Sequence, residues 1–205
     1  MTSPLSRRAF ATAAMASLLV SCGGPRTGQG TTAPAASTAP PTARSSANAA
    51  RALDRSVPVR LEIPAIDVNT SVMRLGLASD GTVQVPPITA NDRAGWYRHS
   101  PTPGQTGPSV ILGHVTVGTD GDGVFHDLAR LRRGERIVAR LENGSSAVFA
   151  VTAVRTVAKA DFPADAVYGD VDRPELRLIT CGGPRTGDGY ADNVIVFATL
   201  SSTSP

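Results

Sequence analysis

The region from residue 57 to residue 85 largely alternates apolar and polar side chains, a pattern typical of β-strands with one buried face. Its apolar positions are Val57, Val59, Leu61, Ile63, Val72, Leu75 and Leu77. Ser79-Asp80-Gly81 predicts a turn, and residues 82–85 are expected to form the next strand. The pattern therefore indicates short strands joined by tight turns.

Further strand-like runs continue to the end of the chain, separated by turn signals. They are Ser109–Val117, Glu135–Leu141, Ala147–Ala158, Glu175–Cys181 and Asn193–Leu200. Asn143-Gly144 is the strongest hairpin signal, because it separates two alternating runs. Residues 125–131 and 163–168 are expected to form short helices. About seven or eight short strands predict an all-β domain, either a closed barrel or a sandwich, and periodicity does not decide between the two.

The first 22 residues have the features of an export signal. Arg7 and Arg8 make the start positive, and residues 9–20 are apolar but shorter than the ~20 residues that span a membrane. Leu19-Val20-Ser21-Cys22 has the form of a lipobox, so we expect a protein lipid-anchored through Cys22 on the extracellular face of the membrane. The arginine pair resembles a twin-arginine signal, and an ordinary export signal is the alternative.

Residues 23–55 are expected to form a disordered linker. Of the 28 positions from 23 to 50, 24 are Gly, Ala, Ser, Thr or Pro, a composition that cannot bury a core. The folded domain is expected over 56–201, with 202–205 as a tail. The formal charge of +3 includes Arg7 and Arg8 of the signal, and the basic residues do not cluster among aromatic ones. The charge pattern therefore argues against a nucleic-acid partner.

Cys181 is the candidate nucleophile. Cys22, the other cysteine, would be consumed by the lipid anchor, which leaves one unpaired thiol in an exported protein. A cysteine nucleophile needs a partner that helps to form the thiolate, most often a histidine. The chain therefore has to supply a histidine close to Cys181 in space.

Among the three histidines, His114 is the best candidate for that partner. It follows the apolar run 110–113, so its side chain stands where a buried strand emerges, and Gly113 permits close approach of the backbone. His99 and His126 are expected to be solvated. On spacing alone, a buried structural cysteine and an unrelated strand-end histidine would look the same.

No metal or cofactor is expected from the motifs. Asp120-Gly121-Asp122-Gly123 supplies too few carboxylates for a calcium loop and reads as a solvated turn. The sequence contains no cysteine and histidine set with zinc spacing. It also has no phosphate-binding loop after a strand.

The motifs around Cys181 and His114 resemble those of the sortases, the cysteine transpeptidases of Gram-positive cell surfaces. Those motifs are Arg60-Leu61-Glu62-Ile63-Pro64, Ala94-Gly95-Trp96-Tyr97, Pro103-Gly104, Val110-Ile111-Leu112-Gly113-His114-Val115, Phe125 with Leu128, Leu131 and Gly134, Leu178-Ile179-Thr180-Cys181, and Asp192-Asn193-Val194-Ile195-Val196-Phe197. Cys181-Gly182-Gly183 with the Asp-Asn-Val ending is most similar to the actinobacterial class F enzymes. The resemblance implies a closed sortase-type β-barrel with one or two short helices.

The resemblance also implies roles for individual residues. Cys181 would be the nucleophile and His114 the proton donor to the leaving amine. Thr180 and Val115 would contact the substrate. The third catalytic group of the family is an arginine that begins the last strand in several sortases.

This chain has Asp192-Asn193-Val194 where that arginine is expected. Arg185 is the only arginine after Cys181 and is our nominee, with Arg177 and Arg98 as alternatives. The nomination is weakened because the heptapeptide Cys-Gly-Gly-Pro-Arg-Thr-Gly occurs both at 181–187 and at 22–28, in the predicted linker.

The activity implied by the resemblance is a two-step acyl transfer. The enzyme would cleave a C-terminal sorting signal of Leu-Pro-x-Thr-Gly type through a thioacyl-enzyme. It would then pass the product to an amine, such as that of a peptidoglycan precursor. A rival is a lipid-tethered binding module of the same fold without activity. An L,D-transpeptidase is a second rival, although those enzymes place Ser-His-Gly and Cys in one motif that this chain lacks.

Overall fold

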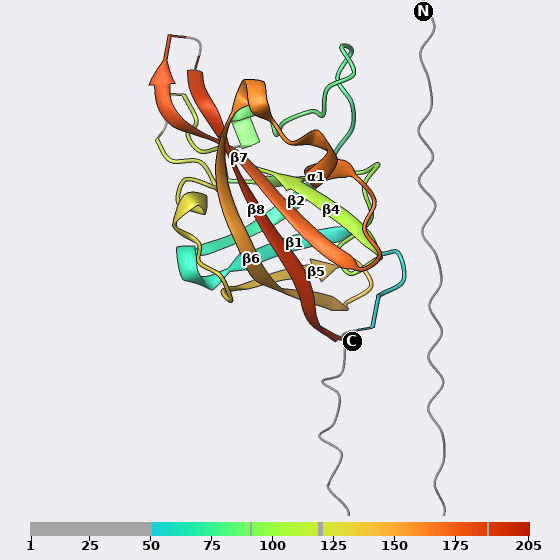
Figure 1. The fold of residues 1–205 in the computed structure, drawn as a ribbon. Coiled ribbons are helices and arrows are strands. Elements are labelled where there is room, and N and C mark those ends of the chain that lie inside the picture. Colours follow the sequence, from blue (N-terminus) through green and yellow to red (C-terminus); the bar gives the residue numbers. More distant parts are fainter. Residues whose placement is uncertain (1–50, 91, 119–120, 188) are drawn as a thin grey trace, which may run out of the picture. The chain divides into compact units, whose positions relative to one another are not determined.

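The alternating pattern of the sequence forms the strands of a β-barrel in the computed structural model, which describes residues 51–90, 92–118, 121–187 and 189–205 (Figure 1). Within these ranges there are eight strands: β1 (Pro58–Ile63), β2 (Val68–Leu75), β3 (Ala94–Tyr97), β4 (Gly107–Leu112), β5 (Arg136–Leu141), β6 (Ser146–Ala158), β7 (Pro174–Thr186) and β8 (Gly189–Ser204). The export signal, Cys22 and the linker up to residue 50 lie outside the described residues.

The strands pair in the order β1-β2-β3-β4-β7-β8-β6-β5, and β5 pairs back onto β1. This closure confirms the predicted closed barrel and excludes the sandwich. The β2–β3 and β4–β7 pairs are parallel, and the other pairs are antiparallel. Figure 1 shows β4, β7 and β8 side by side across one wall of the barrel.

Alternation along the strands divides the buried residues into two clusters. The larger one fills the barrel interior and includes Leu61, Ile63, Trp96, Ile111, Phe125, Phe149, Leu176, Leu178 and Val196. The smaller one is formed by Val110, Val167, Ile179 and Ile195, with Val167 supplied by helix α1 (Ala164–Tyr168). Because Leu178 and Ile179 belong to different clusters, Ile179 and Cys181 lie on the face of β7 opposite to the barrel interior.

The helical elements are short. In addition to α1, the described residues contain four 3₁₀ turns: η1 (Pro64–Ile66), η2 (Ile88–Ala90), η3 (Leu128–Arg130) and η4 (Lys159–Asp161). The helix predicted over 163–168 is confirmed as α1. The helix predicted over 125–131 is reduced to η3, since Phe125, Leu128 and Leu131 are all drawn into the barrel core. No helix in the described ranges is long and apolar enough to cross a membrane.

Several predicted strand boundaries were wrong. Residues 82–85 form no strand, and only an isolated bridge joins Leu77 to Val83, because Pro86 and Pro87 have no N–H to continue a ladder. Strand β4 ends at Leu112 and not at Val117. Strand β3 was missed because its four residues, Ala94–Tyr97, are too few to show a period.

The domain is also longer at both ends than predicted. Strand β8 continues through Ser204, which pairs with Ser146, so residues 202–204 belong to the barrel and are not a tail. At the other end, the N–H of Leu53 donates to the carbonyl of Gly104 at 2.9 Å, and the Leu53 side chain packs against the core. The last residues of the predicted linker are therefore part of the domain.

Candidate active site

Cys181 and His114 meet because β4 and β7 are neighbouring parallel strands. Leu112 at the end of β4 pairs with Ile179 of β7, and the Gly113 N–H donates to the Ile179 carbonyl at 3.1 Å. Parallel neighbours bring their carboxyl ends to the same edge of a sheet. His114 and Cys181, each two residues beyond that pair, consequently arrive at one edge of the barrel.

The two residues line a common cavity of about 170 Å³. Its wall consists of Val85, Pro86, Leu112, Gly113, His114, Ile179, Thr180, Cys181 and Asn193. Cys181 is a free thiol, and the residue is partly exposed. The remaining wall is mostly apolar, which is typical of a cavity that excludes water around a reacting group.

The ring of His114 is oriented by a main-chain group. Its Nε2 atom lies 2.6 Å from the carbonyl oxygen of Pro86. A carbonyl oxygen only accepts hydrogen bonds, so Nε2 carries the proton and Nδ1 of the neutral ring is left as an acceptor. Nδ1 is therefore the nitrogen that can exchange a proton in the cavity.

The other two histidines are placed elsewhere. Of the three, all of which lie in the described part of the chain, only His114 lines this cavity. The ring of His99 packs on Tyr97, with 5.4 Å between the ring centroids. His126 Nδ1 lies 3.0 Å from a carboxylate oxygen of Asp122. His114 is thus the histidine that shares a cavity with Cys181, and its role as proton donor stays a prediction.

Gly113 makes the close backbone approach that was predicted for it. A Cβ at this position would lie 2.6 Å from Cδ2 of Phe125, which belongs to the barrel core. Such a distance is shorter than side chains tolerate, so only glycine allows the chain to pass here. The Phe125 N–H also donates to the His114 carbonyl at 2.9 Å. Both contacts hold the backbone of His114 against the core.

Thr180 and Val115 differ in their relation to the cavity. Thr180 is 3% exposed and lines it, and its Oγ1 has no hydrogen-bond partner among the described residues. Val115 does not line the cavity, and its carbonyl accepts a 2.9 Å bond from the Gly123 N–H. The structure thus brings together Cys181, His114 and Thr180, and leaves Val115 in the adjoining loop.

None of the arginines considered from the sequence lines the cavity. The guanidinium of Arg185 is exposed and lies 6.0 Å from the centroid of the Tyr190 ring, across the β7–β8 hairpin. Arg98 is exposed and donates to His99. Arg177 is buried, with its Nη2 2.6 Å from a carboxylate oxygen of Glu175, so it serves the packing of β7.

Asn193 is a residue of the site that the sequence reasoning did not nominate. It is the Cα partner of Cys181 in the β7–β8 ladder, and its side chain lines the same cavity. The signal was present as Asp192-Asn193-Val194 at the position of the expected arginine. The register of β8 on β7 was needed to show that Asn193 pairs with Cys181 across the ladder.

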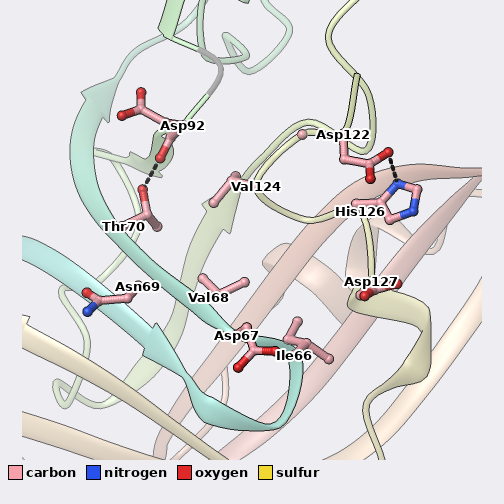
Figure 2. A pocket seen from close by; sticks show the side chains of 11 residues that line it. Ile66, Asp67, Val68, Asn69, Thr70, Asp92, Asp122, Val124, His126 and Asp127 are labelled. Atoms are coloured by element: carbon pink, nitrogen blue, oxygen red, sulfur yellow. Dashed lines mark hydrogen bonds and ion pairs between the residues drawn. The ribbon is translucent and has the colours of Figure 1, made fainter. Parts of the chain in front are cut away.

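A separate, acidic pocket lies at the start of β2. It is lined by Asp67, Asp92, Asp122 and Asp127 together with Val68 (Figure 2). The carboxylates of Asp67 and Asp127 lie apart from the Asp122–His126 pair in this view. No group of three or more metal-ligating side chains occurs among the described residues. Asp120 of the predicted solvated turn lies outside them.

A comparison with protein-family models completes the assignment. The model of the Sortase domain matches residues 61–201, which includes Cys181, His114 and all eight strands in part or in full. The chain belongs to the sortase family. A sortase domain is a cysteine transpeptidase domain that acts on sorting signals and amine acceptors.

Solved structures with the same fold include three sortases. Sortase A from Corynebacterium diphtheriae, a lid mutant, has a TM-score of 0.55 and 21% identity, with 72% of each chain covered. Sortase C-1 from Actinomyces oris has a TM-score of 0.53 and 21% identity, covering 70% of this chain and 74% of its own. Listeria monocytogenes sortase A has a TM-score of 0.54 and 18% identity, covering 74% and 90%. The search of curated proteins finds no match.

Proposed function

We propose that this sortase cleaves a sorting signal of Leu-Pro-x-Thr-Gly type and transfers it to a cell-wall amine, with Cys181 as nucleophile and His114 as proton carrier. The observation that carries the proposal is that these two side chains line one small, mostly apolar cavity. A thiol and an imidazole in that setting are the pair that nucleophilic acyl transfer requires.

The first half-reaction would form a thioacyl-enzyme. The Cys181 thiol loses its proton to Nδ1 of His114, and the thiolate attacks the carbonyl carbon of the Thr that precedes Gly in the signal. The tetrahedral intermediate then collapses, the peptide C–N bond breaks, and the imidazolium returns the proton to the leaving glycine amine. In the second half-reaction an amine attacks the thioester and loses a proton to Nδ1 of His114, the C–S bond breaks, and the leaving Cys181 thiolate takes up that proton. Attack by water instead would make the enzyme a hydrolase.

Substrate contacts are proposed for the residues around the thiol. Thr180 would contact a bound peptide as part of the cavity wall, while its hydroxyl, on the face of β7 opposite to Cys181, lies toward the barrel interior. Val115 would contact the substrate from the loop beyond His114. Arg185 would stabilise the oxyanion only if the hairpin brings its guanidinium toward Cys181, and Asn193 already lines the cavity.

The cellular location proposed for the enzyme is based on its N-terminal residues and on the motifs near Cys181. We propose that an export signal directs the chain out of the cell and that Cys22 is acylated, so that the linker tethers the domain to the outer face of the membrane. Surface proteins with a C-terminal sorting signal and a peptidoglycan precursor are the partners proposed for that location. The Cys-Gly-Gly and Asp-Asn-Val motifs support a class F enzyme of actinobacterial type.

The test uses the full chain carrying Cys22→Ala, so that Cys181 is its only thiol. Incubation with a quenched sorting-signal peptide should give cleavage and, by intact mass, an adduct equal to the acyl fragment. Cys181→Ala should abolish both, and His114→Ala should lower kcat/KM by about 10²–10⁴-fold. His126→Ala is the matched control and should keep the wild-type rate. Equal cleavage by the Cys181→Ala variant and the parent would refute the assignment.

A lipid-tethered binding module without activity is the second candidate, and the lack of an arginine in the cavity wall favours it. Thiol reactivity separates the two functions. An activated Cys181 should react with a methanethiosulfonate reagent much faster than a simple thiol of the same exposure. His114→Ala should slow that reaction in an enzyme and leave it unchanged in a binding module.

A further inference from the structure

Exposed apolar side chains gather on one segment beside the active site. Val59, Leu77, Val85, Ile88 and Tyr168 are the large apolar residues exposed in the described part of the chain. Three of these five lie between residues 77 and 88, and Val85, which is 60% exposed, also lines the catalytic cavity. A concentration of exposed apolar surface next to a cavity indicates a binding surface.

A second cavity, of about 390 Å³, also borders this segment. Its apolar wall is formed by Met73, Leu75, Ala78, Val85 and Pro87. Val85 is therefore shared by the two cavities, so a chain that leaves the catalytic cavity over Val85 enters the second one directly. The flexible thioether of Met73 lets such a wall adapt to apolar groups of different shape.

Two polar residues, Arg74 and Gln84, line the second cavity, and each has one contact within the protein. The Oε1 atom of Gln84 accepts a 2.8 Å bond from the Gly76 N–H. The guanidinium of Arg74 lies 3.8 Å from a carboxylate oxygen of Glu142. Since the other five lining residues are apolar, an apolar side chain fits the cavity better than a charged one.

The size of the catalytic cavity points the same way. Its volume of about 170 Å³ is too small for a peptide of several residues. Sites for ligands of that size usually measure ~300–1,000 Å³, a range that the two cavities reach together. Because Val85 lines both cavities, an extended peptide held at Cys181 would pass from one into the other along this residue.

We propose that the cavity lined by Met73, Ala78, Val85 and Pro87 is a further substrate subsite of this enzyme, which binds an apolar side chain flanking the sorting signal. The inference rests on the proposed function, because it assumes that a peptide is held at Cys181. It predicts that cleavage depends on a residue that flanks the five-residue signal, in addition to the signal itself.

The first experiment compares sorting-signal peptides that carry Leu or Ser at positions before or after the signal. The full chain with Cys22→Ala should show a kcat/KM roughly tenfold higher for Leu than for Ser at one flank. The flank that responds gives the direction of the bound peptide. Ala78→Asp, with an unchanged Tm, should reduce the Leu-to-Ser ratio to about one, since it places a carboxylate in the apolar wall.

Val59→Asp is the matched control, because Val59 is an exposed apolar residue on β1 outside both cavities and should keep the wild-type ratio. The proposal is overturned if wild type cleaves the Leu and Ser peptides equally at both flanks. It is also overturned if Ala78→Asp retains the preference.

The second experiment does not depend on turnover. Met1, Met15 and Met73 are the only methionines, so ¹³C-methyl labelling gives three signals, of which Met73→Leu identifies one. N-acetyl-leucinamide should shift the Met73 methyl signal saturably, N-acetyl-serinamide should not, and Ala78→Asp should remove the response. No shift with either compound overturns the subsite. A Met73 response without cleavage of any sorting-signal peptide supports the subsite and refutes the proposed function.

Discussion

The imidazole of His114 and the main-chain carbonyl of Pro86 form a 2.6 Å hydrogen bond that links His114 to the segment between β2 and β3. The two residues are 28 positions apart. Pro86 is buried, its ring fixes φ, and the following Pro87 restricts ψ, so the carbonyl has little freedom to turn away. Pro86 therefore acts as a positioning residue through its carbonyl group, and its side chain has no part in the bond.

This bond predicts one tautomer of His114. In ¹⁵N spectra of the neutral ring, Nε2 should be protonated and Nδ1 should not. Pro86→Gly should give a mixture of tautomers and lower kcat by roughly 3–10-fold, because glycine releases about 1 kcal/mol of backbone restriction. An unchanged tautomer in the variant would show that the ring is held by other contacts.

Gly113→Ala should damage both stability and catalysis. Its Cβ would overlap Phe125, so the free energy of unfolding should fall by about 1–3 kcal/mol. The displaced His114 should lower kcat/KM by about tenfold or more. Gly187→Ala is the control, since a Cβ there has nothing within 4 Å. Urea unfolding and peptide cleavage measure the two effects, and similar losses in both variants would contradict the explanation.

Arg177→Ala should destabilise the fold. Arg177 and Glu175 are both buried, and removal of the arginine leaves the carboxylate with only the exposed Arg173, at 2.7 Å. The expected loss in the free energy of unfolding is about 3 kcal/mol. Arg173→Ala breaks the exposed contact with the same carboxylate and should cost less than about 1 kcal/mol. Equal losses in the two variants would argue against a structural role that is specific to Arg177.

Stability should fall in acid through the Glu62–Arg140 pair that joins β1 to β5. The hydrogen bond from Arg140, at 2.6 Å, lowers the pKa of Glu62 below its ordinary value of 4.5. As the pH falls through that value the unfolded chain takes up a proton before the folded one, so the stabilisation by this pair is present at neutral pH and is lost in acid. Wild type should therefore exceed Glu62→Gln in unfolding free energy near neutral pH, and the difference should vanish once the pH falls below the lowered pKa of Glu62 in the folded state. A difference that is constant with pH would exclude this ionisation as its cause.

The sequence predicted well where local chemistry decides. The alternation at Leu61 and Ile63 identified β1, and Asn143-Gly144 identified the β5–β6 turn, because burial of one strand face and positive φ at Gly144 are local requirements. Alternation failed for residues 82–85. Val83 and Val85 stay outside the barrel core, and so does Leu77, the bridge partner of Val83. A period of two shows that side chains alternate, and it does not show whether a neighbouring strand is available.

The candidate site divides in the same way. Cys181 and His114 could be selected from the sequence, since few residue types form a thiolate or carry its proton and the surrounding motifs are those of the sortases. Arg185 could not be tested by sequence, because the turn of the β7–β8 hairpin determines where its guanidinium points. The burial of Arg177 could not be predicted from the sequence. Its partner Glu175 has the same appearance in the sequence as an exposed carboxylate at a strand end, and only the packing of β7 buries the pair.

By itself, the sequence determined an all-β domain with a cysteine and a histidine at strand ends and the motifs of a sortase. Only the tertiary structure decided that the sheet closes, that β4 lies parallel to β7 so that His114 and Cys181 line one cavity, and that the Pro86 carbonyl bonds the histidine while Asn193 pairs with Cys181 across the ladder. Side-chain type and periodicity depend on neighbours along the chain. Strand order and register depend on which distant surfaces bury each other, and no local pattern encodes that choice.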